Sequence, residues 1–279
     1  MTFRAGVDAI GAGAAQLVFS TRPATGAIVL LAVALVAPVS AVTAVVGLAA
    51  ATAVAIWSRW NRLLLRDGLF GYNGVLLGLV WPAIFGPTSP GFWLLVPAAI
   101  GTTALFGALL PAFSRRNVPL LGLPFLAVAW LASAAGTLLG WRAAIASPPP
   151  VIGGPLAGWS DPVILRAIVS AAAPALVVFL LVALAVFLDA RRRLGAMLLG
   201  AGAGLVAAVL LGGAEGLLWT GAFAYNAVPA AVGIDAAVEG RRRRRIALAG
   251  GGAALAAVAW AFVTPPLLAI ALFPLTAPM

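Results

Sequence analysis

The sequence predicts an all-α polytopic membrane protein whose two halves are inverted repeats. Of the 279 residues, 63% are hydrophobic and 9% are charged, whereas soluble domains carry roughly 25% charged residues. Several apolar runs are long enough to cross a hydrocarbon core about 30 Å thick as helices. Most arginines lie in short connectors between these runs, and one phrase of glycine, tyrosine and asparagine occurs in each half.

Glycine, proline and arginine divide the apolar sequence into nine full spans and two short segments, 8–20 and 163–173. A connector rich in proline and glycine, residues 146–160, separates an expected first repeat, residues 1–145, from a second repeat, residues 161–279. The expected full spans are 24–38, 39–58, 69–85, 91–113, 119–141, 174–188, 194–212, 217–236 and 246–263.

The arginines test this count of spans. The chain has no lysine, and its 17 arginines and seven acidic residues give a net charge of +10. Thirteen arginines lie in the connectors after the second, fourth, sixth and eighth spans: Arg59, Arg62, Arg66, Arg115, Arg116, Arg191, Arg192, Arg193 and Arg241 to Arg245. The positive-inside rule therefore places these connectors and the N-terminus in the cytoplasm, in a multi-pass protein of the cytoplasmic membrane. We attribute the positive charge to orientation beside membrane lipid and expect no nucleic-acid partner.

An odd number of spans before the central connector makes the second half enter the membrane from the opposite side, so the halves can be inverted copies.

The charged residues also limit the function. The acidic residues lie at or close to span ends and none lies at a predicted span centre, which favours passive transport over coupling to protons or sodium. Cysteine and histidine are absent, which excludes disulfides, thiolate metal sites and histidine-dependent catalysis. We expect no enzyme, no metal and no cofactor.

The repeated phrase reads "GLFGYNGVLLGL" in the first half and "GAFAYNAVPAAVGI" in the second. Asn73 and Asn226 are 153 residues apart, and the residues before them are Tyr72 and Tyr225. An amide inside an apolar segment needs polar partners, and beside glycine it suits a point where a helix breaks. We expect a break at each asparagine, near the midplane of the membrane. The alternative is an interhelical hydrogen bond from a continuous helix.

The first phrase resembles the glycine-aromatic-asparagine-glycine signature of the urea transporter family. "QLVFSTRPATG", residues 16–26, is similar to the family's Gln-x-x-Phe-x-x-Asn-Pro segment on a re-entrant helix, and "PLLGLPF", residues 119–125, resembles its Pro-x-Leu-Thr-x-Pro-Phe segment. In the second half "PLTAP", residues 274–278, resembles the latter segment. The resemblance implies two inverted repeats of about five transmembrane helices plus one re-entrant helix each, a homotrimer, and one pore in each subunit.

The resemblance also assigns the residues of the pathway. Gln16 would offer an amide oxygen and Phe19 one wall of an aromatic slot. Tyr72 would be an aromatic and Leu76 an apolar pore residue, and Asn73 and Asn226 are the signature asparagines. Tyr225 would be the counterpart of Tyr72, and Thr276 would supply one hydroxyl of a ladder of oxygen acceptors. Urea is flat and neutral and has four N–H donors, so aromatic slots and carbonyl acceptors suit it. We expect channel-like, facilitated transport of urea down its gradient. The alternatives are a passive channel for ammonia, short amides or water, and a coupled carrier built from inverted repeats.

The sequence departs from the family pattern at several positions. Arg22 replaces an asparagine, Gly122 replaces a threonine, and Pro229 occupies the position that matches Leu76. The expected amide or acid and aromatic are missing near Val169 and Ala172 in the second half. The first half continues for roughly 20 apolar residues after its proline motif, about one span, whereas the chain ends at Met279. We therefore expect the second repeat to lack its last span.

Overall fold

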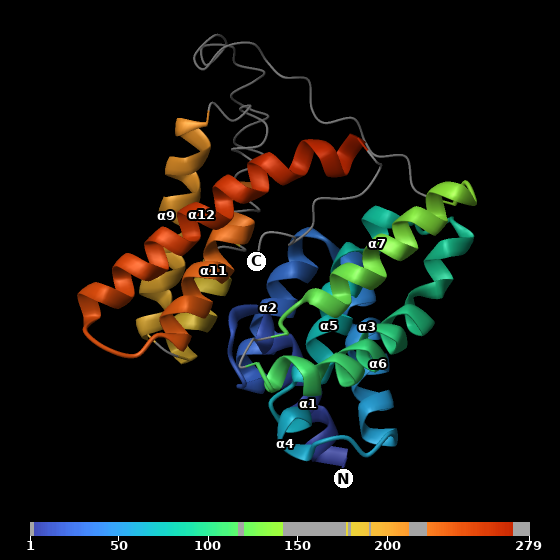
Figure 1. Cartoon of the computed structure of the whole chain (residues 1–279). Helices are drawn as coiled ribbons and strands as arrows, with labels where there is room; N and C mark the ends of the chain where they lie inside the picture. Colours follow the sequence, from blue (N-terminus) through green and yellow to red (C-terminus); the bar gives the residue numbers. More distant parts are fainter. Residues whose placement is uncertain are drawn as a thin grey trace. The chain divides into compact units, whose positions relative to one another are not determined.

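A computed structural model describes residues 3–116, 120–141, 177, 180–189, 191–211 and 222–269 (Figure 1). Every element in these residues is a helix, and the helices belong to two compact units that are treated separately below. The helices of the first unit are α1 (Phe3–Ala15), the 3₁₀ helix η1 (Gln16–Val18), α2 (Pro23–Val36), α3 (Pro38–Trp57), α4 (Arg62–Arg66), α5 (Leu69–Ile84), the 3₁₀ helix η2 (Pro90–Leu94), α6 (Leu95–Ser114) and α7 (Leu123–Leu138). The second unit contains a helical segment, Leu180–Asp189, and helices α9 (Arg191–Leu210), α11 (Ala222–Ala237) and α12 (Arg242–Ala269).

The helix lengths fit a helical membrane protein. Within the described residues three helices are long and apolar enough to cross a membrane: Pro38–Trp57, Pro90–Ser114 and Arg242–Phe262. A fourth span results if the bent pair Ala5–Val18 and Pro23–Val36 is counted as one. In the first half a helix lies in each of the five predicted full spans. The main difference in the second half is α12, which continues beyond the predicted end of its span at Val263 and includes Thr264.

Proline and asparagine set several of the helix boundaries in the first unit. Pro23 and Pro38 occupy the first turns of α2 and α3, where the missing N–H of proline costs nothing. Ala37 separates these two helices with φ −141° and ψ 68°, which is outside the helical region. The side chain of Asn61 accepts hydrogen bonds from the N–H groups of Leu63 and Leu64 and thereby caps α4.

Glycines allow α3 and α5 to pack with their backbones in contact. A Cβ atom at Gly47 would overlap the carbonyl oxygen of Gly74, and a Cβ at Gly74 would overlap that of Gly47. One turn further along α5, the hydroxyl of Thr43 donates a hydrogen bond of 2.7 Å to the carbonyl of Gly78. Small residues and such polar contacts hold helices together in lipid, where apolar surface alone gives no driving force. Gly71, Gly74 and Gly78 of the signature phrase therefore form the contact surface for α3.

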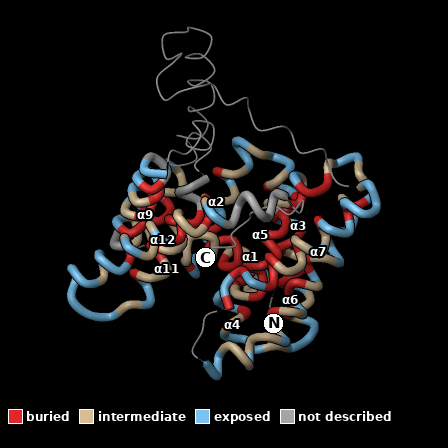
Figure 2. Tube along the Cα trace, turned by 45° about the horizontal axis from the view of Figure 1, so that its top comes forward, coloured by how far each residue is buried: buried red, intermediate tan, exposed pale blue. Residues whose placement is uncertain are grey.

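The buried residues of each unit lie where its helices face one another (Figure 2). Many large apolar side chains are nevertheless exposed on the outer surfaces. Leu35 on α2 is 58% exposed and Val42 on α3 is 65% exposed. Large apolar side chains on an outer surface are expected for helices that face lipid.

The second unit contains a close contact between α9 and α11 that is similar to the contact between α3 and α5. Helix α11 packs against both α9 and α12, as α5 packs against both α3 and α6. A Cβ atom at Gly200 on α9 would lie 2.8 Å from the carbonyl oxygen of Ala227 on α11. Gly200 follows Gly47 by 153 residues, and Ala227 follows Gly74 by the same 153 residues. The spacing that separates the two asparagines thus also relates two close backbone contacts, one in each unit.

Candidate functional site

The first helical segment is interrupted where the sequence predicts a re-entrant helix. Helix α1 ends at Ala15, η1 follows, and Phe19 has a left-handed backbone with φ 55°. The N–H of Phe19 donates to the Gln16 carbonyl at 3.0 Å, and the N–H of Ser20 donates to the Ala15 carbonyl at 3.0 Å. The chain then turns into α2, and the two parts of this segment are bent by 67°. Gln16 and Phe19 thus lie at the interruption, and both side chains are partly exposed.

Gln16 connects this interruption to the start of the signature helix. Its Nε2 donates a hydrogen bond of 2.7 Å to the carbonyl oxygen of Asp67, between α4 and α5. Gly68 follows with a left-handed backbone of φ 78° and packs so closely on α1 that a Cβ atom would overlap the backbone of Ala12 and Gly13. A glycine is required there both by the backbone conformation and by the close contact.

Tyr72 and Leu76 are one helical turn apart on α5 and face the same side. Both are buried, at 9% and 6% exposed, and belong to one apolar cluster with Phe125 of α7. Leu17 of η1 packs against this cluster. The structure therefore brings Tyr72 and Leu76 next to the interrupted segment that carries Gln16.

The predicted helix break at Asn73 is wrong. Helix α5 is continuous through Asn73, and the fully buried amide instead serves another helix. Its Oδ1 accepts a hydrogen bond of 3.0 Å from the N–H of Phe125 in the first turn of α7, and its Nδ2 donates to the Leu121 carbonyl at 3.4 Å. The interhelical alternative is thus confirmed for Asn73, which caps α7 from a neighbouring helix. The reason is that Gly122, at the N-cap position of α7, has no side chain to do so.

The third motif contains an irregular turn that Asn73 stabilises. Leu121 has a left-handed backbone with φ 41°, a conformation that is costly for a residue with a Cβ atom. The turn leaves the Leu121 carbonyl pointing toward Asn73 and starts α7 at Leu123. Gly122 itself has φ −86° and lies next to this turn.

In the second unit helix α11 is also continuous through Asn226, so the predicted break there is wrong as well. The Asn226 side chain is fully buried, and neither its Nδ2 nor its Oδ1 has a hydrogen-bond partner among the described residues. Tyr225 is part of the same helix. Thr276, and the positions near Val169 and Ala172, lie outside the described residues.

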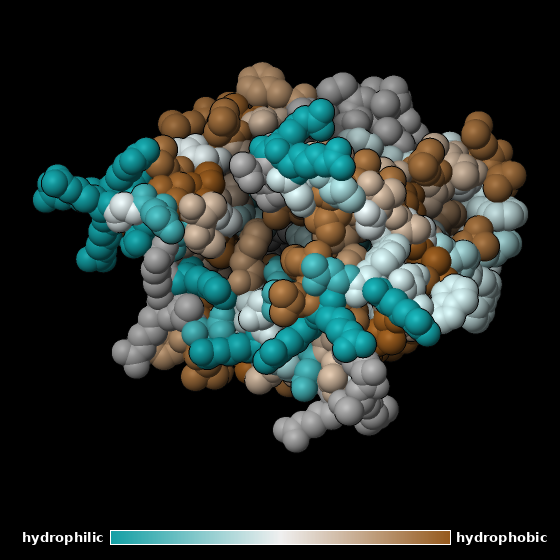
Figure 3. All heavy atoms as spheres, turned by 60° about the horizontal axis from the view of Figure 1, so that its bottom comes forward, coloured by the Kyte–Doolittle hydropathy of each residue, from teal (hydrophilic) through white to brown (hydrophobic). Residues whose placement is uncertain are grey.

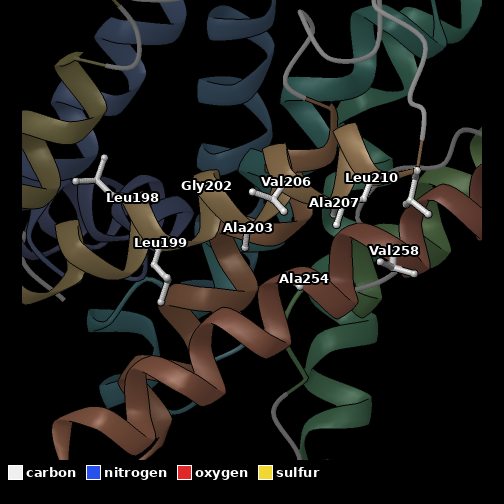
Figure 4. A pocket seen from close by; sticks show the side chains of 10 residues that line it. Leu198, Leu199, Gly202, Ala203, Val206, Ala207, Leu210, Ala254 and Val258 are labelled. Carbon is white, nitrogen blue, oxygen red and sulfur yellow. The ribbon is translucent and has the colours of Figure 1, made fainter.

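A separate groove of about 620 Å³ lies between α9 and α12 (Figure 4). The side chains that line it, among them Leu199, Val206 and Val258, are all apolar. Such a lining cannot replace the water hydrogen bonds of a small polar solute. We therefore do not assign this groove to the transport pathway.

Three features of the site could not be predicted from the sequence. The carbonyl groups of Asp67 and Leu121 are the partners of Gln16 and Asn73, and backbone acceptors carry no residue-specific signal. Leu17 packs against the apolar cluster that contains Tyr72 and Leu76, but in the sequence it does not differ from any other leucine of a span. The left-handed residues Phe19 and Leu121 were also missed, because glycine is the usual marker of that conformation.

Comparison with known proteins agrees with the motifs. The family model of the urea transporters matches residues 7–279. The chain is 29% identical over 123 residues to Urea transporter 1 of Rattus norvegicus, an alignment that covers 43% of this chain and 32% of that protein. It is 30% identical over 135 residues to Urea transporter 1 of Ovis aries and to that of Capra hircus. Each of these two alignments covers 47% of this chain and 35% of the relative. The chain thus covers about a third of the length of these relatives. Since the family model matches nearly the entire sequence and the family motifs meet in the first unit, this chain is a member of the urea transporter family.

Proposed function

We propose that the chain conducts urea passively across the cytoplasmic membrane, in a channel-like manner. The observation that carries the proposal is the convergence of three family motifs that are far apart in the sequence. Gln16 of the first motif is bonded to Asp67 at the start of the second, and Asn73 of the second is bonded to Leu121 and Phe125 of the third. A pathway assembled from these motifs requires such convergence.

The bonding of Gln16 supports its role as an acceptor for urea. A carbonyl oxygen can only accept, so the Asp67 carbonyl fixes the Gln16 amide with its nitrogen toward α5. The Oε1 atom then points to the other side of the amide, and no donor in the described part of the chain is bonded to it. An oriented amide oxygen can take over a hydrogen bond that the N–H groups of urea lose when they leave water.

The proposed pathway residues carry no charge, which supports passive transport. Gln16, Phe19, Tyr72 and Leu76 supply an amide, two aromatic rings and an aliphatic side chain. Coupling to an ion gradient generally uses an ionisable group within the membrane, and none belongs to this set. We propose Tyr225 and Thr276 as the matching contributions of the second half.

The 153-residue spacing supports the proposal that the chain is built from two inverted repeats. It relates Asn73 to Asn226 and also relates the closely packed pairs at Gly47 and Gly200. Inverted repeats in membrane transporters place a permeation site near the bilayer midplane. We further propose a homotrimer with one pathway in each subunit, by analogy with the family.

Stopped-flow light scattering on liposomes that contain the purified full chain tests the transport function. A urea gradient should produce reswelling much faster than in liposomes without protein. Formamide and ammonium gradients on the same liposomes distinguish urea from other small neutral solutes. Urea reswelling at the rate of empty liposomes would contradict the proposal. Faster entry of only ammonia or formamide would identify that compound, and not urea, as the transported solute.

A further inference from the structure

A cavity of about 650 Å³ lies at the end of the first unit that carries the start of α1, the end of α3 and α4. Three arginines line it, Arg59, Arg62 and Arg66, together with a single acidic residue, Asp8. None of these four side chains forms an ion pair within the described part of the chain. The lining of the cavity therefore carries an excess of two positive charges, and its arginines are not paired with an acidic side chain of the described residues.

The lining is amphipathic. Ile56 and Leu65 contribute apolar surface to the same cavity, and Trp60 contributes an aromatic ring. Next to it Trp57 is 84% exposed and Leu63 is 70% exposed. Figure 3 views the molecule from below and shows hydrophilic side chains gathered among hydrophobic ones on this face. Exposed tryptophan and arginine at the end of a membrane-spanning helix are typical of the headgroup level of a bilayer.

The walls of the cavity are fixed by packing and hydrogen bonds. The Trp60 ring packs on Phe70 with ring centroids 5.1 Å apart, and a Cβ atom at Gly107 would lie 2.7 Å from the Trp60 ring. The N–H of Arg59 donates to the Ile56 carbonyl at 3.1 Å, and the N–H of Trp60 donates to the Ala55 carbonyl at 3.3 Å. The Asn61 cap fixes the start of α4, so the backbone that carries the arginines is preorganised.

Arg59 has a left-handed backbone with φ 55°. A glycine would adopt this conformation without strain, whereas an arginine has to be held in it. Its side chain lines the cavity together with those of Arg62 and Arg66. A strained backbone at a residue that lines a charged cavity suggests that the side chain is used for binding.

We propose that this cavity binds the phosphate headgroup of an anionic phospholipid. The guanidinium groups of Arg59, Arg62 and Arg66 provide the planar donors that match phosphate oxygens. Ile56, Leu65 and Trp60 contact the glycerol and the upper part of an acyl chain. A free inorganic anion would leave these three side chains uncovered. The proposal concerns a site outside the transport pathway and holds whichever solute the chain carries.

Native mass spectrometry of the full chain in detergent tests the site by titration with dioleoylphosphatidylglycerol and with dioleoylphosphatidylcholine. We expect one phosphatidylglycerol to bind at least about tenfold more tightly than phosphatidylcholine, because charge-assisted bonds to arginine require the net negative headgroup. The double variant Arg62→Gln/Arg66→Gln should lose this preference. Equal binding of both lipids by the unmodified protein would overturn the proposal.

The double variant Arg115→Gln/Arg116→Gln is the matched control. These arginines are exposed, follow α6 and do not line the cavity, and Phe113 shortly before them packs in the same apolar cluster as Trp60. The control should keep the phosphatidylglycerol preference. An equal loss in both double variants would show that the lipid responds only to the positive charge of this end of the protein, and the proposal would be wrong.

Asp8→Asn gives a test that does not remove an arginine. Neutralising the only acidic group of the cavity should tighten phosphatidylglycerol binding about fivefold, and unchanged or weaker binding would contradict the site. Millimolar inorganic phosphate separates the two possible sources of a phosphate ligand. Retention of the lipid in its presence supports a lipid site, whereas displacement of the lipid would identify a free-anion site instead.

Discussion

At the residue scale, two amides hold the candidate site together. Gln16 bonds to the Asp67 carbonyl and Asn73 bonds to both Leu121 and Phe125. Each amide connects segments that are about 50 residues apart, and each satisfies backbone groups near an irregular turn. An unpaired backbone group in an apolar environment costs about 1 to 3 kcal/mol, so these side chains have a structural role that is separable from contact with a solute.

Asn73→Ala should destabilise the protein by about 1 to 2 kcal/mol, because it removes the cap of α7 and leaves the Phe125 N–H unpaired. Asn73→Asp keeps an acceptor for that N–H but places a carboxylate at a fully buried position facing the Leu121 carbonyl oxygen, so it should destabilise the protein at least as much as alanine. Thermal unfolding in detergent, followed by tryptophan fluorescence, measures both variants. Equal stability of the alanine variant and the unmodified protein would show that the cap has no energetic role.

Asn226→Leu tests whether the second asparagine has the same role. Its amide is buried, and no partner lies within the described residues. If Asn226 caps the second proline motif, as the repeat predicts, replacing it by leucine should lower the stability about as much as the change at Asn73, by about 1 to 2 kcal/mol. If the amide has no partner at all, leucine should raise the melting temperature, because the cost of burying an unpaired amide disappears.

Gln16→Leu should lower the urea flux by about tenfold, because one lost hydrogen bond in the pathway is worth about 1 to 3 kcal/mol. Thr137→Val, at a part-buried hydroxyl of α7 that bonds within its own helix, serves as the control and should leave the flux unchanged. Light scattering on liposomes with matched protein content measures both. An undiminished flux in the Gln16 variant would remove this residue from the pathway while leaving the fold unaffected.

At the element scale, glycine positions decide how closely helices approach. Gly74→Ala places a Cβ atom against the backbone of Gly47 and the side chain of Ala51, and overpacking of this kind costs about 1 to 3 kcal/mol. Gly101→Ala on α6 is the control, since a Cβ atom there has no neighbour within 4 Å. The control should be neutral or stabilising by up to about 1 kcal/mol. Unfolding measurements that rank the two variants in the reverse order would contradict the close α3 and α5 contact.

The same comparison can be made in the second unit on a single helix. Gly200→Ala on α9 brings a Cβ atom to 2.7 Å from the Val228 Cα, whereas a Cβ atom at Gly202 meets nothing within 4 Å. We expect Gly200→Ala to destabilise the protein by about 1 to 3 kcal/mol and Gly202→Ala to have little effect. Similar melting temperatures for the two variants would indicate that the 153-residue spacing does not reflect a repeated packing contact.

At the scale of the whole molecule, the apolar composition and the arginine-rich connectors describe a multi-pass helical membrane protein. If transport is passive, urea flux should be the same with and without a proton or sodium gradient, because no charged group belongs to the proposed pathway. Addition of protonophore or exchange of sodium for potassium in the liposome assay measures this. A severalfold change in initial rate would indicate a coupled carrier instead.

The proposed homotrimer leads to a further expectation at this scale. Light scattering coupled to size-exclusion chromatography should give a protein mass of three 28.0 kDa chains after subtraction of detergent. A monomer that still conducts urea in liposomes would show that transport does not require the trimer. The result bears on the oligomeric state alone, because each subunit is proposed to contain its own pathway.

The sequence by itself determined the class of the protein, its family and the helices of the first half. Hydrophobic length and the placement of proline and arginine are local properties, so they are readable without coordinates. Only the tertiary structure decided what Asn73 does. The sequence placed a helix break at Asn73, whereas the irregular backbone lies at Phe19 and Leu121 and the asparagine bonds to the turn at Leu121 from an intact helix. The physical reason is that a buried amide must find a partner wherever the fold brings one, and that partner lies 48 to 52 residues further along the chain.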